Sequence, residues 1–228
     1  MNRESTVGAV APIELPAPPE PRPQDDPIAA AVIGEIVEKG YEETTVEGVV
    51  RRAGVSRQEF DHRFESLGHC ALDAFERWIV DFKRRVGVAF NSQEDWQSGL
   101  RAAAYATADW MEDNPLVVPF GMVEVLKTPG DMGGVRREET FAFCAEMIDR
   151  GRLAAPDPDA VPDSAPTFAI GAITQLLTHR LQEGADVEPR TVIPEMMVRV
   201  VRIYLGDEAA EAEWTAEPPR AGRPLAKR

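Results

Sequence analysis

Residues 51–67 read RRAGVSRQEFDHRFESL, and this stretch decides the fold. A helical run ends before Gly54, which suits a tight turn, and Ser56 can cap a second short helix. Two helices joined by such a turn are typical of a helix-turn-helix motif, whose second helix lies in the major groove of DNA. That second helix carries Glu59 and Asp61, which DNA phosphates should repel.

The chain of 228 residues is acidic, with a formal net charge of −14 and 43% hydrophobic residues. This hydrophobic content is enough for a buried core, but the charge argues against broad affinity for nucleic acid. The longest apolar stretch, residues 115–126, is interrupted well short of the roughly 18 residues of a membrane-spanning helix. No signal peptide is recognisable, and Cys70 and Cys144 lie far apart, so we expect a cytoplasmic protein without membrane contact.

The spacing of apolar residues predicts helices along the whole chain and no strand. The first helix is expected at 25–39, where Asp25 or Asp26 can cap it, and Thr44 with Glu47 forms a capping box for the second. A long helix begins near Ser66 and continues to about residue 88. Further helices are expected at 94–112, 115–127, 132–154, 166–182 and 189–205.

Residues 28–67 read IAAAVIGEIVEKGYEETTVEGVVRRAGVSRQEFDHRFESL, with the segments EKGYEETTV and RAGVS and an aromatic residue ending the recognition helix. This span resembles the N-terminal domain of TetR-family transcriptional regulators, and the later VVRIYLGDEAAEAE resembles many members. The resemblance implies an all-α protein: an N-terminal three-helix bundle with the helix-turn-helix, joined by a long helix to a larger effector-binding and dimerisation domain. The expected parts are a disordered Pro-rich arm at 1–24, the DNA-binding domain at 25–70, the larger domain at 71–206 and a flexible tail at 207–228.

The recognition helix has two distinct sides. Phe60 and Phe64 lie four residues apart and should face the core, so Gln58 and His62 should project to the opposite side and contact bases. The alternative is that this side is merely solvated. The full set of residues expected to contact DNA is Thr44, Thr45, Ser56, Arg57, Gln58, Glu59, Asp61, His62, Arg63 and Ser66.

Two residues depart from the family pattern, because Asp61 replaces a usual Tyr and Leu67 a usual Lys, both of which typically touch phosphate. Residues 25–65 contain five Lys or Arg against ten Asp or Glu. We therefore expect the phosphate contacts to come from backbone N–H groups near Thr44 and Ser66, the Thr45 hydroxyl, Arg57 and Arg63. Glu59 or Asp61 could also accept a hydrogen bond from a cytosine amino group.

The last two predicted helices have wide apolar faces, which suggests that one side packs within the chain and the other on a second copy. The alternative is an internal helix of a monomer. The expected dimer contacts are Ile173, Leu177, Val192, Met196, Met197, Val200, Val201 and Tyr204.

Aromatic and Met residues of the middle helices could line a pocket for an apolar effector, although most such residues belong to a core. The candidates, with two polar groups, are Tyr105, Trp110, Phe120, Met122, Phe143, Met147, Gln175 and His179.

No enzyme, metal or cofactor site is recognisable, since the three histidines, His62, His69 and His179, are scattered and no catalytic motif is present. The sequence therefore predicts a ligand-responsive repressor that binds a near-palindromic double-stranded DNA operator as a homodimer and responds to a small-molecule effector. The alternative is a helical ligand- or partner-binding protein of the same fold with weak or lost DNA binding.

Overall fold

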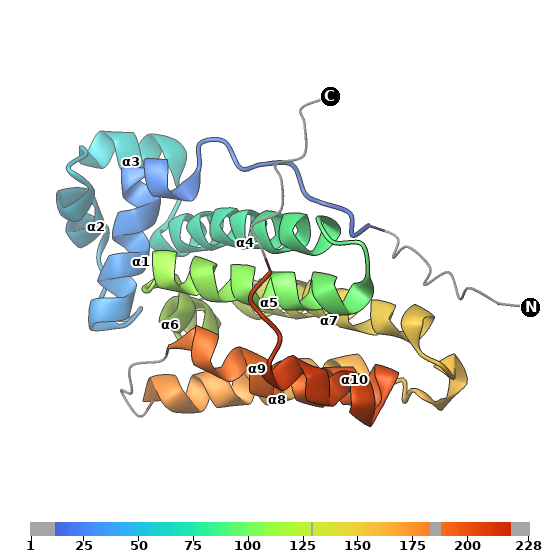
Figure 1. Cartoon of the computed structure of the whole chain (residues 1–228). Coiled ribbons are helices and arrows are strands. Elements are labelled where there is room, and N and C mark those ends of the chain that lie inside the picture. The colour runs from blue at the N-terminus through green and yellow to red at the C-terminus, as the bar shows by residue number, and fades with distance from the viewer. Residues whose placement is uncertain (1–11, 129, 183–187, 220–228) are drawn as a thin grey trace, which may run out of the picture. The chain divides into compact units, whose positions relative to one another are not determined.

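The computed structural model describes residues 12–128, 130–182 and 188–219, and every regular element in these ranges is helical (Figure 1). This confirms the all-α prediction. None of the described helices is long and apolar enough to cross a membrane. The α-helices are α1 (Pro27–Lys39), α2 (Val46–Ala53), α3 (Arg57–Arg63), α4 (Leu67–Asn91), α5 (Trp96–Asp113), α6 (Val117–Met122), α7 (Met132–Asp149), α8 (Ala165–Gln182), α9 (Pro189–Leu205) and α10 (Asp207–Glu211). Short 3-10 helices are η1 (Pro23–Asp25), η2 (Glu124–Lys127), η3 (Arg150–Ala154), η4 (Pro158–Ala160) and η5 (Ala212–Trp214).

The helix ends follow the capping signals of the sequence with two differences. Ser56 and Glu59 form a reciprocal capping box at the start of α3, and Gly54 takes the left-handed conformation, at φ 70°, that ends α2. The predicted helices at 115–127 and 132–154 are each divided, because their last turns tighten into the 3-10 helices η2 and η3.

The chain forms two compact units, and α4, α5 and α7 each contribute to both. The first unit holds Pro16–Arg84 and Trp110–Thr140, and the second holds Arg85–Asp109 with the described parts of 1–15 and 141–228. These units do not follow the expected boundary at residue 70, because the long helices run past it.

In the first unit, α1 packs against α2 and α6, and α2 packs against α3. The α1 residues Ile28, Val32 and Ile36 are almost wholly buried, as is Phe60 on α3. Helices α1 and α2 approach closely at Gly48, where an added Cβ would lie 2.7 Å from a carboxylate oxygen of Glu35. The helix-turn-helix therefore rests on a continuous apolar base that holds α3 at the surface.

The N-terminal segment differs from the disordered arm that its proline content predicts. Ile13 is buried, its N–H donates to Asn91 Oδ1 at 2.8 Å, and Asn91 Nδ2 donates back to its carbonyl at 2.9 Å. In the first unit, Arg84 donates to the carbonyl of Pro16 at 3.1 Å. The expectation of disorder is therefore wrong for residues 12–24. Side chains of α4 donate to and accept from the backbone of this segment, and its last residues begin η1. Residues 1–11 lie outside the described ranges.

The expected flexible tail is likewise wrong for residues 207–214, which form α10 and η5 beside α9 in the second unit (Figure 1). Glu213 is buried and accepts from Arg101 through both carboxylate oxygens, at 2.8 and 2.6 Å. The Gln97 amide also donates to Glu213. Residues 220–228 of the expected tail lie outside the described ranges.

Replacement of Glu213 by Ala tests whether this C-terminal segment is part of the folded unit. Because the change leaves Arg101 partly buried without its carboxylate partner, it should lower the free energy of unfolding by about 2 to 4 kcal/mol. Urea unfolding measures the loss, and Glu217→Ala, at an exposed position, is the matched control. A loss no larger than that of the control would mean that the segment is only loosely attached.

Candidate nucleic-acid interface

The exposed side of α3 has the arrangement that its periodicity predicts. Phe60 is fully buried and packs against Phe64 with ring centroids 5.3 Å apart, whereas Gln58 and His62 are exposed. The turn before the helix is fixed by the Val55 N–H, which donates to the carbonyl of Val50 at 3.1 Å. Two polar side chains able to contact base edges are thus presented on a supported helix.

A surface groove of about 490 Å³ lies beside these two residues. Its apolar wall comes from Pro27 and Ile28 at the start of α1 and from Val55 in the turn before α3. The lining residues are Pro27, Ile28, Val55, Ser56, Gln58, Glu59, His62 and Arg63.

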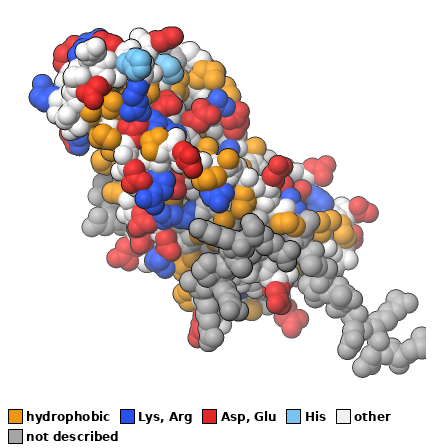
Figure 2. All heavy atoms as spheres, turned by 90° about the horizontal axis from the view of Figure 1, so that it is seen from above, with side chains coloured by type: hydrophobic (Ala, Val, Ile, Leu, Met, Phe, Trp, Pro, Cys, Tyr) orange, Lys and Arg blue, Asp and Glu red, His pale blue; other side chains and the backbone are white. Residues whose placement is uncertain are grey.

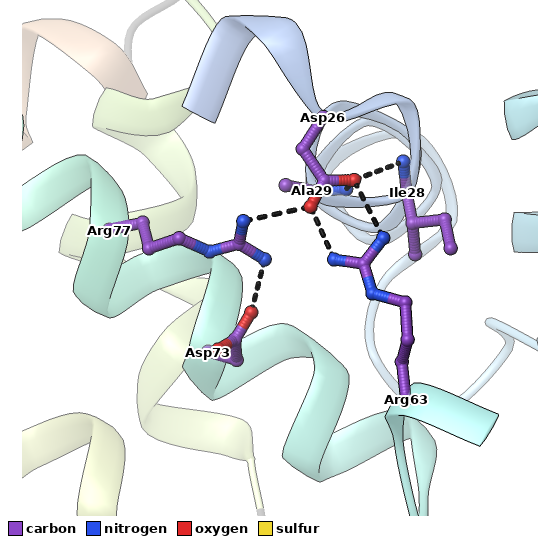
Figure 3. A network of polar contacts seen from close by, with 6 residues as sticks. All are labelled: Asp26, Ile28, Ala29, Arg63, Asp73 and Arg77. Atoms are coloured by element: carbon purple, nitrogen blue, oxygen red, sulfur yellow. Dashed lines mark hydrogen bonds and ion pairs between the residues drawn. The ribbon is translucent and has the colours of Figure 1, made fainter. Parts of the chain in front are cut away.

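One buried carboxylate joins α1, α3 and α4 (Figure 3). Asp26 caps α1 by accepting from the backbone N–H groups of Ile28 and Ala29, at 3.0 and 3.4 Å. The same carboxylate accepts from Arg63, at the end of α3, and from Arg77 of α4, the latter at 2.8 Å. The recognition helix is therefore fixed to its neighbours by charge as well as by apolar packing.

The charge of Asp26 is maintained in spite of its burial. Burial alone would raise the pKa of this carboxyl, but the hydrogen bonds and positive charges of Arg63 and Arg77 outweigh it and hold the pKa at about 2. Arg63 therefore also positions α3, in addition to the phosphate contact that the sequence predicts for it.

Arg57 also has protein partners, in this case on the exposed side of the motif. Its Nε donates to both carboxylate oxygens of Asp61, at 2.9 and 3.0 Å, and its Nη1 donates to Glu47 Oε1 of α2 at 2.5 Å. The bond to Asp61 and then the charge of Glu47 raise the pKa of Arg57. The negative charge of Asp61 is thus balanced by Arg57 within the protein.

Glu59 is occupied by the helix cap. Its Oε2 accepts from the backbone N–H and the hydroxyl of Ser56, at 2.7 and 2.8 Å. These bonds to Ser56 hold the pKa of Glu59 below its usual range. One carboxylate oxygen of Glu59 thus has a structural role at the start of α3.

The prediction that Thr44 caps α2 is wrong. Thr45 is the capping residue, and its hydroxyl accepts from the Gly48 N–H at 3.1 Å. Thr44 is buried and donates to the carbonyl of Gly40 at 2.7 Å, so its side chain cannot reach DNA. Ser66 is exposed before α4 and accepts from the His69 N–H at 3.1 Å.

Most positive charge in residues 25–65 is neutralised inside the motif. Four of the five Lys and Arg side chains in this fully described stretch form ion pairs with carboxylates, and Arg51 is the exception. On the face drawn in Figure 2, the acidic and basic side chains of the described residues are interspersed and form no single basic patch. The interface offers hydrogen-bonding groups and few unpaired cations.

The residues expected to form dimer contacts on α8 and α9 differ in exposure. Helix α9 packs against α8, α10, η3 and η5 of the same unit, so its wide apolar face is largely covered by its own chain. Met196 and Ile173 keep partial exposure, and the side chain of Leu177 lies outside the described residues. The buried members of the expected set are Val192, Met197, Val200, Val201 and Tyr204.

The residues expected to line an effector pocket are divided between the two units. Trp110, Phe120 and Met122 belong to the first unit, where Phe120 packs on Phe75 and Trp110 donates to Asp81 at 3.0 Å. The second unit holds the others, of which Met147 is buried, Tyr105 and Phe143 are half-buried, and Gln175 and His179 are exposed on α8. The two polar candidates are therefore surface residues of the chain.

The described residues contain no group of three or more His, Cys, Asp or Glu side chains that could hold a metal ion. Burial raises the pKa of the Cys70 thiol to about 12, so this thiol is protonated at neutral pH and unsuited to nucleophilic or metal-binding chemistry.

Comparison with known proteins identifies the motif. Residues 28–66 match the model described as bacterial regulatory proteins, tetR family. No curated protein matches the chain by sequence. The matched family consists of regulatory proteins, in agreement with the expectation that the chain is not an enzyme.

Solved structures show where the fold occurs elsewhere. The chain is similar to the fatty acid degradation regulator FadR from Bacillus halodurans, with 13% identity and a TM-score of 0.66 over 78% of this chain and 97% of that chain. It is similar to the transcriptional regulator FadR from Bacillus subtilis in complex with stearoyl-CoA, with 12% identity and a TM-score of 0.67 over 79% and 97%. A TetR family transcriptional regulator from Chloroflexus aurantiacus J-10-FL has 18% identity and a TM-score of 0.50 over 86% and 93%.

The pH dependence of stability tests the Asp26 network. Because the folded pKa of about 2 lies below the ordinary value of 3.8, the stabilisation is present above the ordinary pKa and is lost as pH falls through the folded one. Asp26→Asn keeps a capping side chain but removes the charge. The difference in unfolding free energy between the native protein and this variant should shrink by about 2 kcal/mol between pH 4 and pH 2. A difference that stays constant over this range would contradict the network.

Proposed function

We propose that this chain is a ligand-responsive transcriptional repressor that binds a near-palindromic operator as a homodimer. The basis is that residues 28–66 match the tetR family model and that the fold is similar to that of solved regulators. The observation that carries this proposal is the pair of exposed side chains Gln58 and His62 on a recognition helix. The end of this helix is held by the bond from Arg63 to the buried Asp26. Such a repressor acts in the cytoplasm, where its operator lies.

The proposed division of roles follows from which groups are exposed and which are already bonded. Gln58 and His62 contact base edges, and Gln58 can bond an adenine bidentately. Backbone N–H groups at the start of α2 and the Thr45 and Ser66 hydroxyls contact phosphates without needing a charged side chain. Arg57 also contacts a phosphate when it leaves its carboxylate partners.

We place the dimer contact on the outer side of α8. Phe168 is 72% exposed there, and Ala172, Gln175 and His179 follow it at helical spacing on the same exposed stripe. Met196 of α9 and Ile173 of α8 are the members of the expected set that keep partial exposure. A two-fold dimer brings the same stripe of both copies together, and the two recognition helices then fit half-sites about one DNA turn apart.

The proposed effector is an apolar small molecule held by the aromatic and Met side chains of the middle helices. The solved Bacillus subtilis FadR contains stearoyl-CoA, and its similarity in fold to this chain is compatible with an effector of this character. Release of the operator then follows from an effector that favours a conformation in which the two recognition helices no longer match their half-sites.

A second candidate is a helical ligand- or partner-binding protein with weak or lost DNA binding. The pairing of four of the five cations of the motif favours it, because paired cations contribute little to phosphate binding.

Binding of the purified protein to the DNA upstream of its own coding region distinguishes the two candidates. The repressor should bind a specific site there, and Gln58→Ala should cost about 1 to 3 kcal/mol at that site and relax the preference at one base pair. Fluorescence anisotropy with the preferred site and with random DNA of equal length measures both effects. Equal losses on the two DNAs would remove Gln58 from base recognition, and no binding by the native protein would favour the second candidate.

Charge on the α8 stripe tests the dimer. Phe168→Glu should yield a folded monomer, because a carboxylate at the centre of a two-fold apolar contact meets its own copy. Leu153→Glu is the control, since Leu153 is apolar and 77% exposed but lies on η3. Light scattering gives the mass of each variant. A Phe168→Glu protein that stays dimeric would exclude this stripe.

A further inference from the structure

Arg57 is the one cation of α3 on the exposed side of the motif, and carboxylates hold it from two directions. Asp61 binds its Nε from one helical turn further along α3, and Glu47 binds its Nη1 from α2. We propose that Glu47 and Asp61 form an intramolecular latch on Arg57 that suppresses binding to DNA of random sequence. This inference rests on the proposed DNA-binding function and concerns its specificity.

The latch occupies two of the five N–H donors through which Arg57 could bind DNA. An arginine binds phosphate oxygens or the O6 and N7 atoms of guanine through its N–H groups, and carboxylate oxygens present the same kind of acceptor in a similar geometry. Nε carries a single N–H, and both carboxylate oxygens of Asp61 accept from it at 2.9 and 3.0 Å, so phosphate must displace Asp61 before it can bind this atom. Glu47 accepts from Nη1 at 2.5 Å and occupies one of the two N–H groups of that atom. The two carboxylates are therefore competitors of DNA.

The exposure of the three side chains distinguishes this cluster from a structural ion pair. Arg57 and Asp61 are each 52% exposed and Glu47 is 69% exposed, whereas Asp26, which binds Arg63, is 1% exposed. Ion pairs in open solvent add little to folding stability and exchange readily, while a buried pair resists exchange. Arg57 can thus pass from its carboxylates to a ligand without loss of the fold.

The latch acts differently on random and preferred DNA. Random DNA offers mainly phosphate, and a cation already neutralised within the protein releases few DNA counterions when it binds. The preferred site adds base contacts to Gln58 and His62, which offset the cost of opening the latch. Glu47 and Asp61 therefore widen the gap between specific and nonspecific affinity, and this gives Asp61 of the recognition helix a function.

The experiment compares the double variant Glu47→Gln, Asp61→Asn with the native full-length chain on random DNA over a range of salt concentrations. Freeing one Arg per protomer should steepen the slope of log affinity against log salt by about 0.9 per protomer, and thus by about 1.8 for a dimer. Affinity for random DNA at low salt should rise roughly 2- to 20-fold for each protomer that binds. The ratio of specific to random affinity should fall.

Two controls separate the latch from a general loss of negative charge. Glu42→Gln, Glu43→Gln removes the same charge from two exposed residues that do not contact Arg57, and it should leave the slope unchanged. In an Arg57→Ala background the latch substitutions should have no more effect than this control. An equal steepening in the control, or an undiminished effect without Arg57, would overturn the latch. Thermal unfolding of each variant verifies that the fold is retained.

The possible outcomes separate this inference from the proposed function. If the native chain binds its preferred site and the latch variant shows an unchanged slope, the latch is wrong and the regulator stands. Binding of random DNA by the variant but of no DNA by the native chain would support the latch and contradict a DNA-binding repressor. If neither protein binds any DNA, both proposals fail.

Discussion

The position of the recognition helix depends on the buried carboxylate of Asp26. A charge removed from water is tolerated only when it is paired and hydrogen-bonded, and this one caps α1 while binding Arg63 of α3 and Arg77 of α4. Three separate segments must therefore be in place together before the charge is satisfied. The apolar base under Phe60 supplies most of the packing, but the carboxylate fixes where α3 ends relative to α1 and α4 (Figure 3).

The acids of the recognition helix are explained by their partners within the protein. Glu59 completes the helix cap with Ser56, and Asp61 binds Arg57. A chain with a net charge of −14 that pairs most cations of its DNA-binding motif gains little from phosphate attraction. Affinity in such a protein has to come from hydrogen bonds to bases and from backbone N–H groups, which favours selectivity over general binding.

The sequence predicted the parts of this arrangement that depend on local spacing. Helical periodicity was sufficient for the exposed Gln58 and the buried Phe60, and the cap at Ser56 has a recognisable pattern. The pair between Asp26 and Arg63 spans 37 residues, so no local pattern indicates it. The wide apolar face of α9 predicted that two sides of this helix are covered, but no local pattern indicated that α10 and η5 of the same chain pack against it.

A genome-wide footprint of the purified native protein tests the central claim most directly. A homodimer whose recognition helices present Gln58 and His62 should enrich near-palindromic sites whose half-sites lie about 10 to 10.5 base pairs apart from centre to centre, or a multiple of that distance. Such sites, one of them upstream of the protein's own coding region, are the result expected of a specific repressor. A footprint with the same sequence composition as the input DNA, without any enriched sequence, would contradict a specific repressor. It would favour a ligand- or partner-binding protein of the same fold.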